Sequence, residues 1–335
     1  MKQEMIIKQN VGVDVSKDDF KVALSHLTHE HRIVVRCTRT FANTMQGFKQ
    51  LQEWVNLKKQ SQQDTHFTME ATGVYYEGLA FFLYEQSYNL HVVLPNYVKK
   101  YAESLGIKSK TDKLDAKTLA QMGLERELRL WQPVTPSLLG LKQLTREREA
   151  LVRTRTNVAN QLHAYRHQGK PKKESIQRSQ KLIAFIDKQV KQIEKEITIF
   201  INHDEKLRTK IGYLDSIPGV GVLTAAVIVA ETNGFAAFES IKQLTSYAGL
   251  DVRIQESGKW KGKSKISKRG NSHIRKMLFM PSLSKKKNDL ATKQFFDRIK
   301  EKKGIGMIAT IAVERKLLGL MFTLWKKEEM YCAAI

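Results

Sequence analysis

The feature that most constrains this sequence is a change of pattern near Pro136. Before that point, short apolar runs with the period of β-strands alternate with stretches that have helical spacing. After it the strand patterns stop, and long, highly charged helical patterns begin. A chain of 335 residues, 41% of them hydrophobic, is long enough to bury more than one core. The sequence therefore predicts an α/β region followed by a mostly helical one.

The first region is expected to form a mixed β-sheet. The segments 11–16, 19–25 and 32–37 predict three consecutive strands, which favours an antiparallel meander. Strands and helices then alternate, so the expected order is βββαβαβα with helices on both faces of the sheet, the architecture of the ribonuclease H superfamily. The later elements are expected at 43–58 (helix), 66–72 (strand), 75–86 (helix), 91–95 (strand), 97–105 (helix) and 112–123 (helix).

The helical region contains a coiled-coil signal. One series of apolar residues recurs at spacings of three and four, and a second series keeps a seven-residue period in the preceding helix. The basic break HQGKPKK separates the two, which predicts a helical hairpin. Periodicity leaves open whether the hairpin folds on itself or pairs with another subunit. The two series are Ile183, Ile186, Val190, Ile193, Ile197 and Phe200, and Leu144, Leu151, Val158 and Tyr165.

Positive charge is concentrated in the same helical region. The net charge is +23 and the pI is about 9.8, which argues against an ordinary neutral metabolic enzyme and indicates a polyanionic partner. Residues 1–125 hold 16 Lys and Arg against 14 Asp and Glu, whereas residues 126–335 hold 41 against 20. This asymmetry favours a carboxylate-containing chemical centre joined to a nucleic-acid-binding part. Charge for solubility alone is the alternative.

We expect a cytoplasmic protein with no membrane partner. The longest apolar run, 222–230, is too short to span a bilayer and fits a buried strand or helix. The first residues lack the pattern of a secretory signal. The chain has 2 cysteines, which provides neither a disulfide framework nor a zinc-ligand spacing.

Four acids are candidates for a metal centre. Asp14 lies on the first expected strand, Glu70 ends the fourth, and Asp112 and Asp115 share one turn at the start of a helix. Two carboxylates on one turn repel each other unless a cation lies between them, and Mg²⁺ prefers oxygen ligands. The sequence thus predicts a pair of Mg²⁺ ions for phosphodiester cleavage. Individually, each acid has an ordinary explanation, such as a helix N-terminus or a strand end.

Several segments are expected to contact nucleic acid. Lys108 and Lys110 lie beside the acids. The segment SIPGVGVLTAA resembles the hairpin of a helix-hairpin-helix element, in which Gly219 and Gly221 let backbone N–H groups approach phosphate; a plain helix connection is the alternative. Residues 253–276 hold nine Lys or Arg and one acid. Candidates there are Arg253, Lys259, Trp260, Lys261, Lys263, Lys265, Lys268, Arg269 and Arg275, with Trp260 either stacking on a base or anchoring the segment.

Five motifs, in this order, resemble a known family: VGVDVSK, MEATGVYYE, KTDKLDA, SIPGVGVLTAA and SYAGLDVRIQESG. They are similar to the bacterial insertion-sequence transposases of the DEDD class, over about residues 11–325. The resemblance implies a resolvase-like catalytic domain (1–127), a coiled-coil region for dimerisation (128–210) and a C-terminal transposase domain (211–335). One departure is Asp251, where relatives often have proline, which puts the shape of that loop in doubt.

The resemblance also implies roles for individual residues. Asp14, Glu70, Asp112 and Asp115 would be the metal-binding acids, and Ser257 would be the nucleophile that attacks the DNA backbone. From its spacing alone, Ser257 is only a turn former. Family members are recombinases guided by a structured non-coding RNA, the bridge RNA. The resemblance also implies a tetramer, a dimer of dimers, that acts on element ends and target DNA.

The leading hypothesis is therefore a Mg²⁺-dependent DNA transposase that cleaves and rejoins strands through a phosphoserine intermediate. Two alternatives stay open. One is a structure-selective Holliday-junction-type endonuclease, in which metal-activated water attacks and Ser257 is a loop residue. The other is a non-catalytic nucleic-acid-binding protein.

Overall fold

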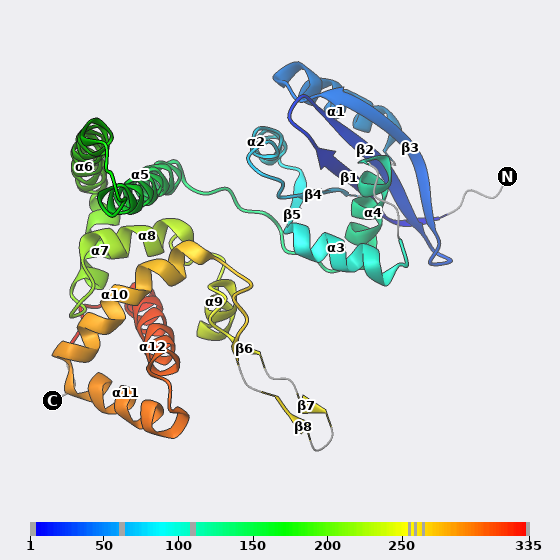
Figure 1. Ribbon diagram of the computed structural model, residues 1–335. Helices are drawn as coiled ribbons and strands as arrows, with labels where there is room; N and C mark the ends of the chain where they lie inside the picture. Colours follow the sequence, from blue (N-terminus) through cyan, green and yellow to red (C-terminus); the bar gives the residue numbers. More distant parts are fainter. Residues whose placement is uncertain are drawn as a thin grey trace. The chain divides into compact units, whose positions relative to one another are not determined.

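In the computed structural model, which describes residues 5–59, 64–107, 112–253, 256–257, 260–262 and 265–332, the first part of the chain folds around a mixed β-sheet (Figure 1). The strand order is β3-β2-β1-β4-β5. Strand β2 pairs antiparallel with β1 and β3, and β4 pairs parallel with β1 and β5. The predicted mixed sheet is confirmed. Its strands are β1 (Ile6–Val15), β2 (Asp19–Thr28), β3 (Ile33–Ala42), β4 (Thr65–Glu70) and β5 (Asn89–Val93).

Helices cover both faces of this sheet because each strand alternates its side chains between the two. On one face, the odd-numbered residues of β1, such as Val11 and Val13, are buried with Phe48 of α1 and Leu83 of α2. On the other face, Ala23 of β2 is buried with Ala116 of α4. The helices are α1 (Met45–Lys58), α2 (Glu77–Glu85), α3 (Pro95–Ser104) and α4 (Asp112–Glu125).

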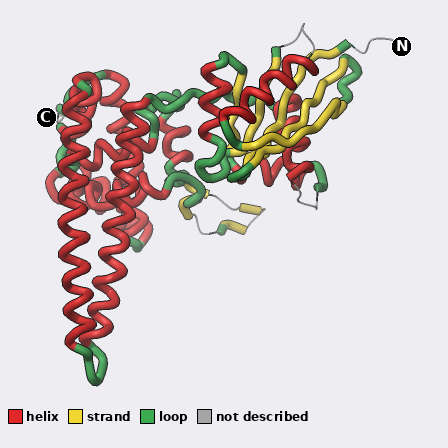
Figure 2. The backbone as a smooth tube through the Cα atoms, turned by 90° about the horizontal axis from the view of Figure 1, so that it is seen from above, coloured by secondary structure: helices red, strands yellow, loops and turns green. Residues whose placement is uncertain are grey.

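The predicted helical hairpin is present within one chain (Figure 2). It consists of α5 (Pro136–Arg166) and α6 (Lys173–His203), and ion pairs join the two helices in antiparallel register: Arg148 with Glu194, and Arg155 with Asp187. Side-chain packing supports the same register, because a Cβ at Gly140 would lie 2.8 Å from the ring of Phe200. The predicted seam is buried at Ile186, Ile193 and Ile197, and partly buried at Ile183, Val190 and Phe200.

The hairpin shares its core with the helices that follow it. Ile193 and Ile197 of α6 belong to the same buried cluster as Ile228 of α8 and Leu318 of α12. The chain accordingly divides into two compact units, Met1–Pro133 and Val134–Ile335. The finer division at 127/128 and 210/211 stays a prediction. The remaining helices of the second unit are α7 (Glu205–Asp215), α8 (Val222–Glu231), α9 (Ile241–Tyr247), α10 (Ser272–Asn288), α11 (Leu290–Lys303) and α12 (Gly306–Lys327).

In the second unit, the structure decides one alternative that the sequence left open and adds one helix that it did not predict. The apolar run 222–230 is a helix, α8, which settles the strand-or-helix alternative. Helix α11 was not predicted, because its few apolar residues lie among lysines and only Phe296 is fully buried there. That ring packs in a small separate cluster with Ala309 and Val313 of α12.

Candidate functional site

Asp14 and Glu70 lie at the same level on neighbouring parallel strands. Val13 of β1 is paired in register with Met69 of β4, so the next residues along each strand are Asp14 and Glu70. Val13 and Met69 are fully buried on one face. Because successive side chains alternate, both acids belong to the opposite face, near the carboxyl ends of their strands. Each is partly buried.

Helix α4 covers that face at very close range. A Cβ added at Gly12 would lie 2.1 Å from the carbonyl oxygen of Ala116 and 2.2 Å from the amide nitrogen of Ala120. Only glycine leaves room for this approach. Farther back along β1, the Asn10 amide Nδ2 donates to the Ala120 carbonyl at 2.9 Å. Thus α4 crosses β1 in a fixed register.

This register brings the first turn of α4 toward the two strand acids. Asn10 contacts Ala120, and Gly12, two residues on, also contacts Ala116. The next residue on this face of β1 is Asp14. By the same progression, Asp14 lies at the level of the first turn of α4, which carries the other two predicted acids. Asp115 directly precedes Ala116 and is partly buried. Asp112 is the first residue of the helix, but its side chain lies outside the described part of the structure.

The immediate partners of the strand acids are polar. Thr72 donates its hydroxyl to Oε1 of Glu70 at 3.0 Å. Lys21 of β2 is paired directly opposite Asp14, which places an ammonium group on the same face. Among the side chains that the structure describes, no three His, Cys, Asp or Glu residues form a group that could hold a metal ion. The oxygen-only donors and the strand register fit Mg²⁺, and the four-acid centre stays a prediction.

In the second unit, the predicted glycine turn joins α7 to α8. Gly219 has a φ of +90°, and a Cβ there would lie 3.0 Å from Oγ of Ser284 on α10. This glycine therefore has a structural reason to be present, independent of any phosphate. Gly221 is the N-cap of α8 and is exposed, and no side chain caps this helix. A role for both glycines in phosphate binding stays a prediction.

Ser257 lies in the second of two short two-stranded sheets of the second unit, β6-β9 and β7-β8, here together called the ribbon. Val252 pairs with Ile266 in the strands β6 (Val252–Arg253) and β9 (Lys265–Ile266). Ser257 pairs with Trp260 in β7 (Glu256–Ser257) and β8 (Trp260–Lys261). The serine is exposed. Sequence patterns had indicated only a Gly- and Lys-rich segment here, because two-residue strands leave no detectable periodicity.

Arg275 binds the two ends of this ribbon together at its base. Its Nη1 atom donates to the carbonyls of Ala248 at 2.8 Å, Gly270 at 3.1 Å and Asn271 at 3.3 Å. Beside it, Ser267 donates its hydroxyl to the Asp251 carboxylate at 2.5 Å and its amide to the Asp251 carbonyl at 2.9 Å. The Asp251 side chain thus helps to close the loop base. These contacts give Arg275 a structural role, and DNA binding by this residue stays a prediction.

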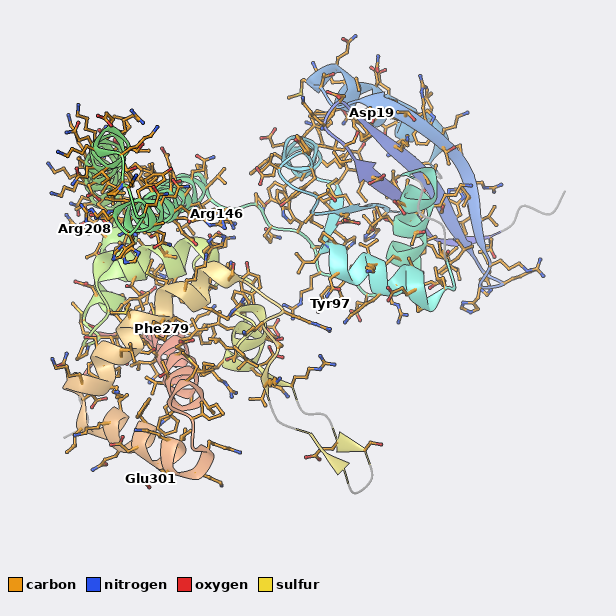
Figure 3. All side chains as sticks on the ribbon, in the orientation of Figure 1. Asp19, Tyr97, Arg146, Arg208, Phe279 and Glu301 are labelled. Atoms are coloured by element: carbon orange, nitrogen blue, oxygen red, sulfur yellow. The ribbon has the colours of Figure 1, made fainter. Side chains whose placement is uncertain are left out.

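A buried carboxylate, which the sequence did not reveal, supports the same base. Glu231 is fully buried at the end of α8 and accepts from Nε of Arg146 at 2.7 Å and Nη2 at 3.0 Å. Asn271 also donates to it at 2.7 Å, and this asparagine caps α10. Burial alone would raise the pKa of Glu231, but the hydrogen bonds from Arg146 and Asn271 hold it below its usual value. Arg146 reaches from α5 toward α8 (Figure 3).

A second buried carboxyl in this unit is Glu314 of α12. Burial raises its pKa to about 7, and the nearby positive charge of Arg275 opposes that rise. The same guanidinium that closes the ribbon base therefore lies in the electrostatic environment of Glu314. The only sequence signals for these two acids were their positions at the end of, or within, apolar helical runs.

The other predicted nucleic-acid contacts lie on or beside the ribbon or outside the described chain. Arg253, Lys265, Lys268 and Arg269 are exposed. Trp260 and Lys261 are described by their backbone alone. Lys108, Lys110, Lys259 and Lys263 fall outside the described residues.

Two family matches cover much of the chain. Residues 11–171 match a DEDD family described as Transposase, and residues 212–297 match the family described as Transposase IS116/IS110/IS902 family. Residues 172–211 lie between the two matches. Within the described ranges, every helix is too short or too polar to traverse a bilayer.

Curated relatives match over most of the sequence. The pilin gene-inverting protein of Moraxella bovis is 30% identical over 334 residues, which covers 97% of this chain and 98% of the relative. Its counterpart from Moraxella lacunata matches equally well. The transposase for insertion sequence element IS1111A of Coxiella burnetii is 25% identical, over 72% of this chain and 73% of its own. Among solved structures, a Ppx/GppA family member from Aquifex aeolicus aligns over 94% of this chain and 91% of its own, with 8% identity and a TM-score of 0.23, which is too low to relate the two folds.

Proposed function

Because the chain belongs to the IS110 family of transposases, enzymes that act on DNA, we propose that it cleaves and rejoins DNA strands through a phosphoserine linkage. The observation that carries the proposal is the register of the first unit. Asp14 and Glu70 lie side by side on parallel strands, and the close packing at Gly12 directs the first turn of α4 toward them. This arrangement supports a ribonuclease H-like catalytic centre at the carboxyl edge of the sheet.

We assign metal binding to the four acids Asp14, Glu70, Asp112 and Asp115. When bound, Mg²⁺ would supply positive charge that polarises the scissile phosphate and stabilises the developing oxyanion. Glu70 is oriented by the hydroxyl of Thr72. Lys21, opposite Asp14, contributes a further positive charge on the face to which the DNA phosphate would bind. Asp112 and Asp115, one helical turn apart, would complete the oxygen donors.

Ser257 is the proposed nucleophile. Its Oγ forms a bond to phosphorus, the bond between phosphorus and one deoxyribose oxygen breaks, the serine proton leaves to a base, and the released sugar oxygen takes up a proton. The phosphoserine product is still a phosphodiester, so the reverse attack by a sugar hydroxyl rejoins the strand without an added energy source. A free serine is a weak nucleophile, which is why charge stabilisation at the phosphate is required.

We propose that DNA and a structured guide RNA bind mainly through their backbones. The exposed cations Arg253, Lys265, Lys268 and Arg269 line the ribbon that carries Ser257. The turn at Gly219 and Gly221 joins two helices in the manner of a helix-hairpin-helix element, which supports phosphate binding by backbone N–H groups. In this proposal, pairing with the RNA selects the sequence, and the enzyme acts as a homo-oligomer, a dimer of dimers. The relatives named for inverting a pilin gene would use the same strand exchange in inversion.

The test is a search for covalent protein–DNA adducts. The full-length protein is incubated with Mg²⁺, duplex DNA containing the element end and RNA transcribed from the flanking sequence, and is then denatured. We expect an adduct with the wild type and with Ser246→Ala, an exposed serine on α9. Ser257→Ala should abolish the adduct, and Asp14→Asn should reduce it by about 10-fold or more.

The alternatives give different results. A junction endonuclease would cut DNA without an adduct and would be insensitive to Ser257→Ala. A protein that only binds nucleic acid would produce neither cuts nor adducts under any of these conditions.

A further inference from the structure

The end of the helical hairpin has an unusual charge. Residues 166–181, here called the hairpin tip, comprise the last residue of α5, the connecting turn and the first turns of α6. In the described structure, the cations of this tip are exposed and none is paired with a carboxylate, in contrast to the bridges Arg148 to Glu194 and Arg155 to Asp187 nearer the middle. The tip has one acid, Glu174, and six cations: Arg166, Lys170, Lys172, Lys173, Arg178 and Lys181.

Folding of the hairpin does not explain these lysines. Lys172 is the N-cap of α6, Lys173 begins the helix, and no side chain caps this terminus. The N-terminus of a helix carries partial positive charge, so cations there are unfavourable. The repulsion among the neighbouring lysines adds to this cost. Positive charge at the tip is therefore disadvantageous to stability and needs another reason.

The tip also extends beyond the core of the second unit. Leu144 and Leu151 of α5 pack against the main buried cluster of this unit. Farther along, Val158 and Leu162 of α5 are buried but do not belong to that cluster. From Leu151 to Arg166 the helix rises by about 20 Å, at 1.5 Å per residue. Figure 2 shows the two helices projecting together from the other helices of the unit.

We propose that the hairpin tip binds the phosphate backbone of duplex DNA outside the site of strand exchange. The proposal rests on the proposed function, because a recombinase that exchanges strands must hold the flanking duplex. The tip contains no Phe, Tyr or Trp, and its one imidazole, that of His167, already stacks on His163, so the tip offers little stacking surface for unpaired bases. A dense set of exposed lysines and arginines, by contrast, matches the regular phosphates of a duplex. A reach of about 20 Å corresponds to about six base pairs.

The test compares two matched triple variants of the full-length protein. Lys170→Gln, Lys172→Gln and Lys173→Gln remove three charges at the tip. Lys188→Gln, Lys191→Gln and Lys195→Gln remove three exposed charges elsewhere on α6. Affinity for mixed-sequence duplex DNA is measured against salt concentration. Each lost phosphate contact reduces the magnitude of the negative slope of log K against log salt by about 0.9. We therefore expect the magnitude of this slope to fall by about 2.7 in the tip variant and by much less in the control variant.

Two further measurements distinguish DNA binding from a structural role. With duplexes of increasing length, the affinity of the tip variant should stop rising about six base pairs earlier than that of the wild type. Its melting temperature should be unchanged or higher, because unfavourable charges have been removed from a helix N-terminus. A drop in melting temperature together with weaker binding would mean a structural role and overturn the proposal.

Other outcomes also overturn it. The proposal is wrong if the salt slope of the tip variant equals that of the wild type. It is also wrong if the control variant shows the same reduction in slope as the tip variant. If the tip variant loses affinity for duplex RNA and not for duplex DNA, the surface serves the RNA instead. The adduct assay distinguishes the two proposals. If the wild-type protein forms the Ser257 adduct and the tip variant binds DNA normally, only the role of the tip is refuted.

Discussion

The two units position their functional residues by different physical means. In the first, small residues allow backbone elements to touch: Gly12 lies against the backbone of Ala116 and Ala120, and Ala23 is buried beside them. In the second, buried charges and hydrogen bonds hold the base of the Ser257 ribbon, with Glu231 accepting from both Arg146 and Asn271. One unit depends on shape and the other on electrostatics.

This difference determines which perturbations each unit should resist. Close apolar packing is insensitive to salt and pH but does not accommodate an added methyl group. A buried ion pair accommodates small changes of volume but not the loss of one partner, because the other charge is left unpaired. Single substitutions in each unit therefore test this contrast.

Glu231→Ala should have the largest effect. It leaves the half-buried Arg146 and the capping residue Asn271 without their shared acceptor, so the second unit should lose about 3 kcal/mol of stability. Amide hydrogen exchange should rise in α8, α10 and the ribbon base and stay unchanged in the first unit. Glu301→Ala, an exposed carboxylate on α11, is the control. If the amide protons are equally protected from exchange in both variants, the buried network around Glu231 does not hold the base of the ribbon.

Gly12→Ala should damage the first unit alone. The new methyl group would overlap the backbone of α4, which has no flexible side chain to move aside, so we expect a loss of about 1–3 kcal/mol. The loss should be the same at low and high salt, which chemical unfolding at two ionic strengths will measure. A salt-dependent loss, or none, would break the contrast between the units.

Glu314→Gln should change how stability depends on pH. Burial raises the pKa of Glu314 from 4.5 to about 7 in the folded state, so folding favours the protonated form. Its contribution to stability is full below pH 4.5 and is lost as pH rises through about 7. The melting temperature of the second unit should fall by a few degrees over this range in the wild type and stay flat in the variant. Parallel curves would contradict the raised pKa.

Gly212→Ala should have the smallest effect and the opposite sign. This glycine lies inside α7, and nothing is within 4 Å of the position that its Cβ would occupy. Alanine favours the helix over glycine, so the second unit should gain about 0.5–1 kcal/mol. Compared with Gly12→Ala, the same substitution should thus stabilise one unit and destabilise the other. A loss of stability would show that α7 is more tightly packed than the structure indicates.

The sheet and the strand acids could be predicted because their signals are local. Short apolar strand patterns placed β1 and β4, with Asp14 on the first of these strands and Glu70 at the end of the other. The glycine and the alanines that bring α4 close were not singled out, because a close contact between residues about a hundred positions apart leaves no pattern in a single sequence.

The base of the ribbon could not be predicted for the same reason. Glu231 and Arg146 are 85 residues apart, and each looks like an ordinary helix charge until the fold brings them together. The role of Ser257 came from the family motifs alone, whereas the metal-binding role of the four acids came from their positions in the expected elements as well as from those motifs, and both stay predictions. Arg275 is hydrogen-bonded to three backbone carbonyls at the ribbon base, a structural role that the sequence did not indicate, and its contact with DNA stays a prediction.

The most direct test of the account is the binding of divalent cations by the acids of the first unit. Calorimetric titration of Mg²⁺ into the full-length protein would compare the wild type with Asp14→Asn, Glu70→Gln and Asp115→Asn, and with Glu85→Gln as an exposed control on α2. The account predicts that each site variant weakens binding about 10-fold or more and that the control binds like the wild type. Unchanged binding in the site variants, or an equal loss in the control, would contradict a shared metal centre.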